Sequence, residues 1–167
     1  MSNESEDKRS LSMSEVMTPE KANFSGNVHG GHIMELLDRV AYACAARYSG
    51  FYVVTLSANN ILFKAPIHVG ELVHCHAMVN YVGTSSLEVG IKVVSENLKT
   101  GEKRHTNSCY FTMVAVQENG EKAKVKPLTL ETPLQKYRYE SAVLRKGLAH
   151  QYQEEHGRQK AEVKKAL

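Results

Sequence analysis

The sequence predicts an α+β fold in which an antiparallel sheet curves around one long helix. Two patterns support this prediction. Residues 30–48 place apolar side chains at steps of three and four, the period of a helix with one apolar face. Three later segments alternate apolar and polar residues and are joined by short turns, as antiparallel strands are. These segments are residues 71–83, 85–97 and 104–116.

Glycine and proline mark the ends of several elements. Gly50 should terminate the long helix, because glycine readily adopts the left-handed conformation that ends helices. Pro66 should end the strand region that follows, because proline cannot donate to a sheet ladder. In chain order we expect a short strand at 12–17, a loop at 20–29, the helix at 30–48, strand segments at 51–58 and 59–66, the three alternating strands, and a charged helix at 134–165.

The long helix is the one strongly apolar helix that the sequence predicts. A single helix cannot cover a broad sheet of long strands, so sheet edges and faces are left over. We expect these surfaces to be buried by self-association into a homodimer or a larger homo-oligomer.

Length and composition point to one domain. The chain has 167 residues, of which 42% are apolar, enough for a real core. No run of 18 apolar residues is present, so no membrane span is expected. The cysteines are odd in number and far apart, which favours buried thiols in a cytoplasmic protein over disulfides. The expected division is a flexible leader (1–11), the main domain (12–130) and a basic C-terminal helix or tail (131–167).

Positive charge is concentrated near the C-terminus. The net charge is +3, and residues 134–167 hold eight basic and four acidic side chains. This pattern fits a solvated surface helix, and it also fits attraction to an anionic ligand that carries phosphates. Nucleic acid is a poor fit as a ligand, because acidic side chains are interleaved with the basic ones and no recognised nucleic-acid-binding motif is present.

The glycine pair Gly30-Gly31 lies where the loop enters the helix. Exposed N–H groups at a helix N-terminus can bind an anion or a developing oxyanion. The alternative is that these glycines only relieve crowding between the helix and the sheet.

Asp38 lies on the flank of the same helix, away from the centre of the apolar stripe. Such an acid can be a general base or a nucleophile, or simply a partly exposed carboxylate paired with Tyr42 or an arginine. Gly31 and Asp38 are separated by about 10 Å of helix. A reacting carbonyl must lie near both groups, so if both are catalytic they must come from different subunits.

Loop amides and histidines complete the candidates. Asn23 and Asn27 precede the helix, where we expect an asparagine to form an Asx turn or to cap the helix. The alternative is that one of these amides holds the attacking water. His74 and His76 share one strand face, but the ligand set needed for zinc is missing, so no metal is expected.

Three stretches resemble the hotdog-fold acyl-CoA thioesterases, and more narrowly the bacterial acyl-CoA hydrolases related to the brain-type cytosolic acyl-CoA hydrolase. They are ANFSGNVHGGHIMELLD, NNILFKAPIHVGELVHCHAMVNYVGTSSLEVGIKVVSEN and TNSCYFTMVAV. The resemblance covers about residues 12–130. It implies a hotdog fold, a long helix wrapped by an antiparallel sheet, paired into double hotdogs and usually assembled as trimers of those pairs.

The resemblance also implies a reaction, the hydrolysis of acyl-CoA to a fatty acid and coenzyme A without a separate cofactor. Asn23 matches the loop asparagine of the family and Asp38 matches its helix acid. The backbone of Gly31 would polarise the thioester carbonyl. Contacts to coenzyme A are expected from Gly30, Lys64, Thr84, Ser85 and Ser86.

Two other functions remain open for a hotdog domain. It can act as a dehydratase or hydratase on acyl thioesters, which needs a histidine and an acid in a different helix motif. It can also bind acyl-CoA as a sensor without catalysis, which the presence of Asp38 disfavours.

Overall fold

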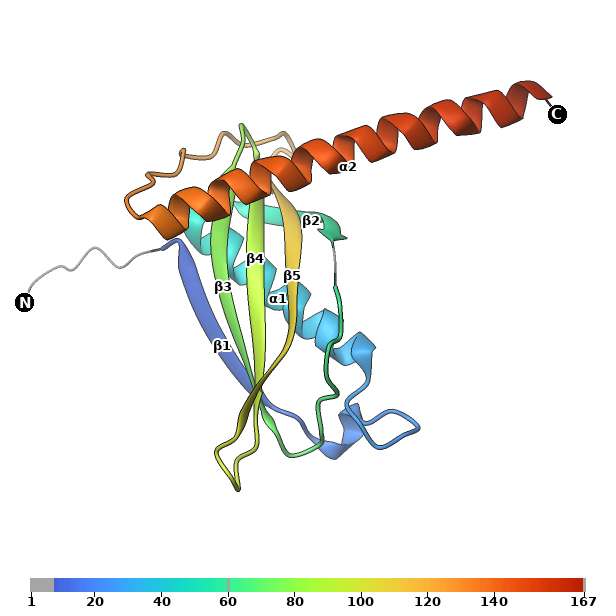
Figure 1. The fold of residues 1–167 in the computed structure, drawn as a ribbon. Helices are drawn as coiled ribbons and strands as arrows, with labels where there is room; N and C mark the ends of the chain where they lie inside the picture. Colours follow the sequence, from blue (N-terminus) through green and yellow to red (C-terminus); the bar gives the residue numbers. More distant parts are fainter. Residues whose placement is uncertain (1–7, 60, 167) are drawn as a thin grey trace, which may run out of the picture. The chain divides into compact units, whose positions relative to one another are not determined.

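Five antiparallel strands form one sheet around the helix α1 (Figure 1). The computed structural model describes residues 8–59 and 61–166. The strands lie in the order β1-β3-β4-β5-β2, so β1 and β2 are the sheet edges. Their bounds are β1 (Ser10–Val16), β2 (Tyr52–Asn59), β3 (Leu72–Val82), β4 (Ser86–Glu96) and β5 (Lys103–Val116).

The helices are η1 (Pro19–Lys21), α1 (Gly30–Ser49) and α2 (Pro133–Ala166). Residues up to Pro127 form one compact unit, and residues from Leu128 onward form a second one that contains α2. Within the described chain, none of these helices combines the length and apolarity needed to cross a membrane.

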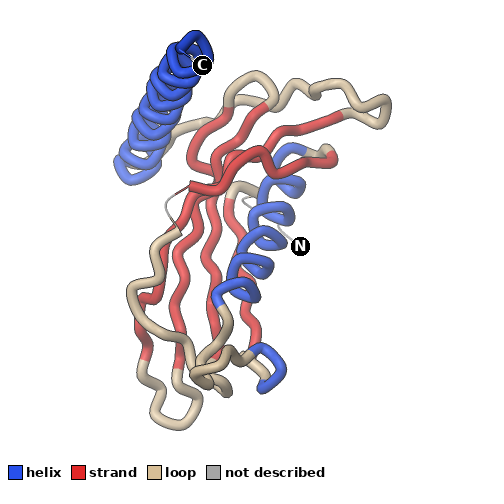
Figure 2. Tube along the Cα trace, turned by 90° about the vertical axis from the view of Figure 1, so that its right-hand side faces the viewer, coloured by secondary structure: helices blue, strands red, loops and turns tan. Residues whose placement is uncertain are grey.

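The helix α1 lies along one face of the sheet and contacts all five strands (Figure 2). Its apolar stripe is buried, with Leu37 and Val40 inaccessible to solvent. The inward residues of the strands complete this core, as the alternation of apolar and polar residues predicts. Gly50 terminates α1 in the left-handed conformation, at φ 75°. The α+β hotdog architecture expected from the sequence is therefore confirmed.

Two expected strand boundaries differ from the structure. The first strand begins at Ser10, inside the range expected to be a leader, while residues 1–7 lie outside the described part of the chain. The strand expected to continue through 59–66 stops at Asn59, so that continuation is wrong. Residues 61–67 form an extended loop whose Lys64 N–H donates to the Thr106 carbonyl at 2.8 Å. An isolated bond of this kind holds the loop near β5 without making a ladder.

Candidate active site

The N-terminus of α1 presents the backbone N–H of Gly30 to a surface hollow. This hollow has a volume of about 270 Å³, and Asn23, Gly30 and Lys64 are among its lining residues. Within the described residues the Gly30 N–H has no hydrogen-bond acceptor. A free N–H at the positive end of a 20-residue helix can stabilise a carbonyl oxygen that gains negative charge.

Gly31, the predicted donor, is already engaged. Its N–H donates to Nδ1 of the His29 ring at 2.9 Å, so His29 caps the helix through its side chain. A Cβ on Gly31 would lie only 3.0 Å from that nitrogen, which explains why a glycine suits this close approach. Gly30 is therefore the better placed of the two donors for a ligand in the hollow.

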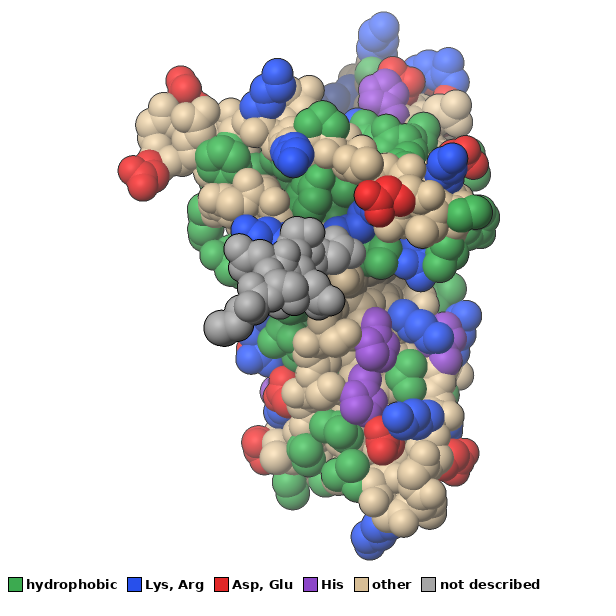
Figure 3. Space-filling model, turned by 90° about the vertical axis from the view of Figure 1, so that its left-hand side faces the viewer, with side chains coloured by type: hydrophobic (Ala, Val, Ile, Leu, Met, Phe, Trp, Pro, Cys, Tyr) green, Lys and Arg blue, Asp and Glu red, His purple; other side chains and the backbone are tan. Residues whose placement is uncertain are grey.

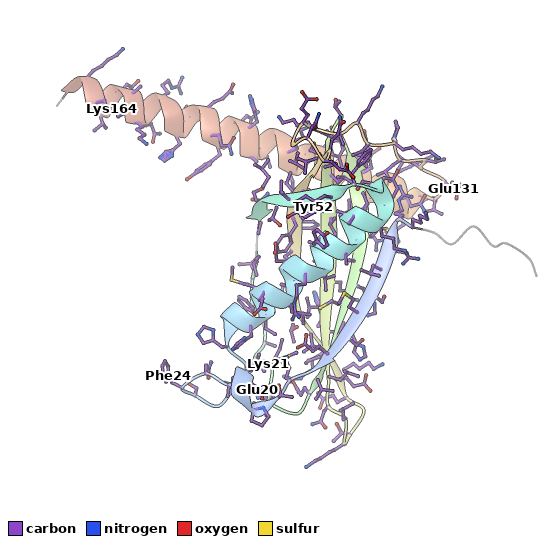
Figure 4. All side chains as sticks on the ribbon, turned by 180° about the vertical axis from the view of Figure 1, so that it is seen from behind. Glu20, Lys21, Phe24, Tyr52, Glu131 and Lys164 are labelled. Carbon is purple, nitrogen blue, oxygen red and sulfur yellow. The ribbon has the colours of Figure 1, made fainter. Side chains whose placement is uncertain are left out.

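Asn23 anchors the loop that leads into α1. Its Oδ1 accepts hydrogen bonds from the Ser25 N–H at 2.8 Å and the Asn27 N–H at 3.2 Å, which is the Asx turn expected by default. The loop tip carries Phe24, which is fully exposed and points away from the sheet (Figure 4). Because the turn uses only the side-chain oxygen of Asn23, its amide nitrogen is left as a donor at the hollow.

Asp38 lies in a second and separate hollow of about 400 Å³. The carboxylate is exposed, and its Oδ1 accepts a hydrogen bond from the Thr55 hydroxyl at 2.6 Å. This partner is neither of those expected from the sequence. The neighbouring Arg39 instead contacts Glu15, with 3.3 Å between its guanidinium nitrogen and the carboxylate oxygen. The Asp38 hollow is lined by Asp38, Arg39, Tyr42, Tyr52, Val53, Val54 and Thr55.

Thr55 is the site residue that the sequence analysis misses. It lies on β2 two residues beyond the buried Val53, so both side chains point toward α1. The pairing of β2 with β5 is irregular directly after Thr55, and such bulges re-aim side chains near functional sites. A hydroxyl at a helix-facing position of the VVT run was the signal available in the sequence.

The two hollows have no lining residue in common. Gly30 and Asp38 are eight residues apart on one straight helix, which separates them by about 12 Å. One chain therefore holds the anion-stabilising terminus and the carboxylate too far apart to act on the same carbonyl. This geometry agrees with the argument from spacing in the sequence.

The residues expected to contact coenzyme A are divided between two places. Lys64 and Gly30 lie together in the first hollow. Thr84 and Ser85 lie in the turn between β3 and β4, and Ser86 is the first residue of β4; none of them lines either hollow. The carbonyls of Thr84 and Ser85 accept hydrogen bonds from the N–H groups of Val125 and Ala115.

The histidines of β3 make hydrogen bonds to neighbouring strands. Ser14 Oγ lies 2.8 Å from Nδ1 of His74, and Nε2 of His74 lies 2.7 Å from Oε2 of Glu96. This hydrogen bond holds the pKa of Glu96 below its usual value. The His74 and His76 rings are stacked with centroids 6.3 Å apart. Figure 3 shows histidines among polar and charged side chains on this side of the sheet. No group of three metal-binding side chains occurs among residues 8–59 and 61–166.

The cysteines do not provide a nucleophile. Cys44, Cys75 and Cys109 are all free thiols with no exposed surface. Burial raises the pKa of Cys75 and of Cys109 to about 12. The reactive thiolate is therefore scarce at neutral pH, which makes these buried thiols poor nucleophiles.

Comparison with known proteins places the chain in a family. The model of the thioesterase superfamily matches residues 25–102. Protein VdlD of Helicobacter pylori is 50% identical over 140 residues, which cover 84% of this chain and 80% of that protein. The uncharacterized acyl-CoA thioester hydrolase YkhA of Bacillus subtilis is 34% identical, covering 76% of this chain and 74% of that protein. The chain belongs to the thioesterase superfamily.

Solved structures agree with this assignment. An acyl-CoA hydrolase from Bacillus cereus has a TM-score of 0.84 at 29% identity, covering 91% of this chain and 93% of its own. A hexameric acyl-CoA thioesterase in its apo form has a TM-score of 0.82 at 31% identity, covering 86% and 92%. YkhA and the two solved structures are thus named as acyl-CoA hydrolases or thioesterases, in agreement with the resemblance seen in the sequence.

Proposed function

We propose that this chain is an acyl-CoA thioesterase whose active site is completed by two subunits. The observation that carries the proposal is the separation described above. One chain places a free helix N-terminus and a hydrogen-bonded carboxylate in two different hollows. Pairing two copies would bring the first hollow of each subunit to the second hollow of the other, giving two complete sites.

A solved relative supports the choice of residues. The acyl-CoA hydrolase of Staphylococcus aureus, 26% identical with a TM-score of 0.81, has been determined with butyryl coenzyme A and coenzyme A. Further structures of that enzyme carry alanine in place of an asparagine, an aspartate or a threonine. Those three positions are separated by 15 and 17 residues in that chain. Asn23, Asp38 and Thr55 are separated by the same 15 and 17 residues.

In the proposed reaction the thioester carbonyl oxygen accepts a hydrogen bond from the Gly30 N–H. Gly31 can add a second hydrogen bond only when the His29 ring releases its N–H. The Asn23 amide donates to the carbonyl or holds the attacking water. These groups stabilise the negative charge that develops on the oxygen as the carbon becomes tetrahedral.

Asp38 of the partner subunit removes a proton from a water molecule as its oxygen bonds to the carbonyl carbon. The carbon–sulfur bond then breaks, and the coenzyme A thiolate leaves and takes up a proton. The Thr55 hydroxyl holds one carboxylate oxygen, which leaves the other free to face the water. Direct attack by the carboxylate, giving a mixed anhydride that water then cleaves, uses the same geometry.

The edge strand β2 is the surface we propose for subunit pairing. Its outer edge carries unpaired backbone groups, which proteins commonly cover by pairing with another strand. Tyr52, Val54 and Leu56 are exposed by 62%, 40% and 68% on this strand. The Asp38 hollow lies beside the same strand, so a subunit paired there would reach the carboxylate. Hexameric assembly in a related acyl-CoA thioesterase is consistent with such pairs being the building units.

Coenzyme A would be bound first through its charge. Lys64 provides a positive charge in the hollow that holds Gly30 and Asn23, and phosphate groups favour such a site. Residues 84–86 remain a proposed contact, which a partner subunit would have to supply to this hollow.

The proposal is tested by incubating the protein with acyl-CoAs from acetyl to palmitoyl and measuring released thiol with a thiol reagent. Hydrolysis supports the thioesterase. Tight binding without turnover would identify an acyl-CoA sensor, and gain or loss of water in the acyl chain would identify a hydratase or dehydratase; either result would overturn the proposal.

Mixing inactive subunits tests the shared site. Asn23→Ala and Asp38→Ala subunits should each be inactive alone, because every site lacks one group. After unfolding and refolding together, random pairing makes half of the dimers mixed, each with one intact site, so about one quarter of wild-type activity should return. The control mixes the wild type with the double variant, whose mixed dimers contain no intact site. If mixing restores nothing although mixed dimers form, the site lies within one subunit.

A further inference from the structure

The helix α2 carries an exposed apolar stripe that the proposed reaction does not use. Leu134, Tyr137, Leu144 and Leu148 are exposed by 55%, 66%, 63% and 56%. With the half-buried Ser141, they are spaced by three, four, three and four residues. We call residues 134, 137, 141, 144 and 148 the α2 seam.

This spacing is the pattern of helices that pack side by side. Steps of three and four average 3.5 residues, which keeps the side chains on one line facing a neighbouring helix. Beyond Tyr152 the exposed side chains are mostly polar, apart from Val163. The seam is therefore confined to two heptads of a 34-residue helix. A helix adapted only to solvent would not need large apolar groups in register over that length.

We propose that the α2 seam packs against the same seam of a second copy of this chain, with the two helices parallel and in register. Because the seam has the spacing of helices that pack side by side, the simplest partner for it is the same seam on a second copy of the chain. The charges beside the seam choose the direction. Glu140 lies on one flank and Arg145 on the other. Parallel packing sets Glu140 opposite the partner subunit's Arg145, whereas antiparallel packing would set like charges against each other.

Two heptads are too short to hold two chains together alone. The seam therefore acts within an assembly that other surfaces already form. A protein of similar fold forms such an assembly. The hexameric hotdog-fold thioesterase of Campylobacter jejuni matches this chain with a TM-score of 0.65 at 27% identity, covering 68% of this chain and 88% of its own. A lipid surface would favour positive charge on both flanks, but Glu140 occupies one of them.

Cysteine cross-linking tests direction and register together. In the parallel arrangement, residue 144 of one helix lies next to residue 144 of the other, so Leu144→Cys should oxidise to a disulfide-linked dimer. The three native cysteines are buried and should not interfere. Val143→Cys is the matched control, because Val143 is also exposed, by 45%, but lies off the seam. It should give far less cross-linked product at the same protein concentration.

A second measurement tests the contribution to assembly. The Leu144→Glu/Leu148→Glu variant should form a smaller assembly than the wild type in size-exclusion chromatography with light scattering, while Val143→Glu should not. Absence of the Leu144→Cys disulfide, or a cross-link that appears only when Tyr137→Cys and Leu148→Cys chains are mixed, would overturn the parallel arrangement. An unchanged mass for the double variant would overturn the role of the seam. These outcomes do not depend on whether acyl-CoA is hydrolysed.

Discussion

Replacing Thr55 with valine removes the hydroxyl that holds Asp38 while keeping the shape of the side chain. The hydrogen bond from Thr55 Oγ1 to Asp38 Oδ1 is 2.6 Å long, typical of a bond to a charged carboxylate. Valine also suits the strand, so β2 should keep its structure. The expected consequence is a carboxylate that is still present but less well oriented toward the water.

The size of the effect follows from the kind of bond. Hydrogen bonds to charged groups contribute about 1.5–3 kcal/mol, and the exposure of both side chains argues for the lower end. A loss of about 1.4 kcal/mol in the transition state corresponds to roughly a tenfold lower rate. We therefore expect kcat to fall by roughly tenfold with little change in KM, because the hydroxyl orients a catalytic group and does not hold the substrate.

Coenzyme A release from a saturating acyl-CoA, followed with a thiol reagent, measures kcat directly. Thr55→Ser keeps the hydroxyl and should retain most of the activity. Thr112→Val is the matched control, since Thr112 lies on the adjacent strand β5 but lines neither hollow. If Thr55→Val keeps kcat within about twofold of the wild type, or if serine fails to restore it, the orienting role of the hydroxyl is refuted.

Three further predictions concern stability and reactivity. Leu37→Ala, at a position with no exposed surface, should lower the free energy of unfolding by about 2–5 kcal/mol in urea titrations. Glu96→Gln should lower the melting temperature at neutral pH. That difference should shrink as the pH falls below the usual pKa of a glutamate, because the hydrogen bond to His74 lowers the pKa of Glu96 and its stabilising effect disappears on protonation. The native protein should react slowly with a thiol reagent, because burial raises the pKa of Cys75 and Cys109 to about 12. The unfolded protein should react at all three cysteines. Fast reaction of the native protein would contradict the burial of these thiols.

Much of the fold could be predicted from periodicity. The long helix was expected at 30–48 and spans Gly30–Ser49, and the alternating segments became β3, β4 and β5 with boundaries shifted by one residue or so. These elements bury one continuous face, so their patterns are strong. The strand predicted at 59–66 was wrong because apolar residues in this segment resemble a strand, although several of them line a hollow at the surface.

The candidate site was only partly predictable. Asn23 and Asp38 stand out because they match the loop asparagine and the helix acid of the family that the sequence resembles. Thr55 did not, because a threonine in a strand is ordinary unless its partner is known. The choice between Gly30 and Gly31 depends on the His29 ring, whose hydrogen bond to Gly31 cannot be read from residue types.

By itself the sequence determined the α+β class, the single wrapped helix and the distance along that helix between the glycines and the acid. Those properties are local, because residue spacing on a helix or strand sets both separation and facing. Only the tertiary structure decided that Thr55 meets Asp38 and that the two halves of the site open into separate hollows. Such contacts join elements far apart in the chain, and they depend on packing that no local pattern encodes.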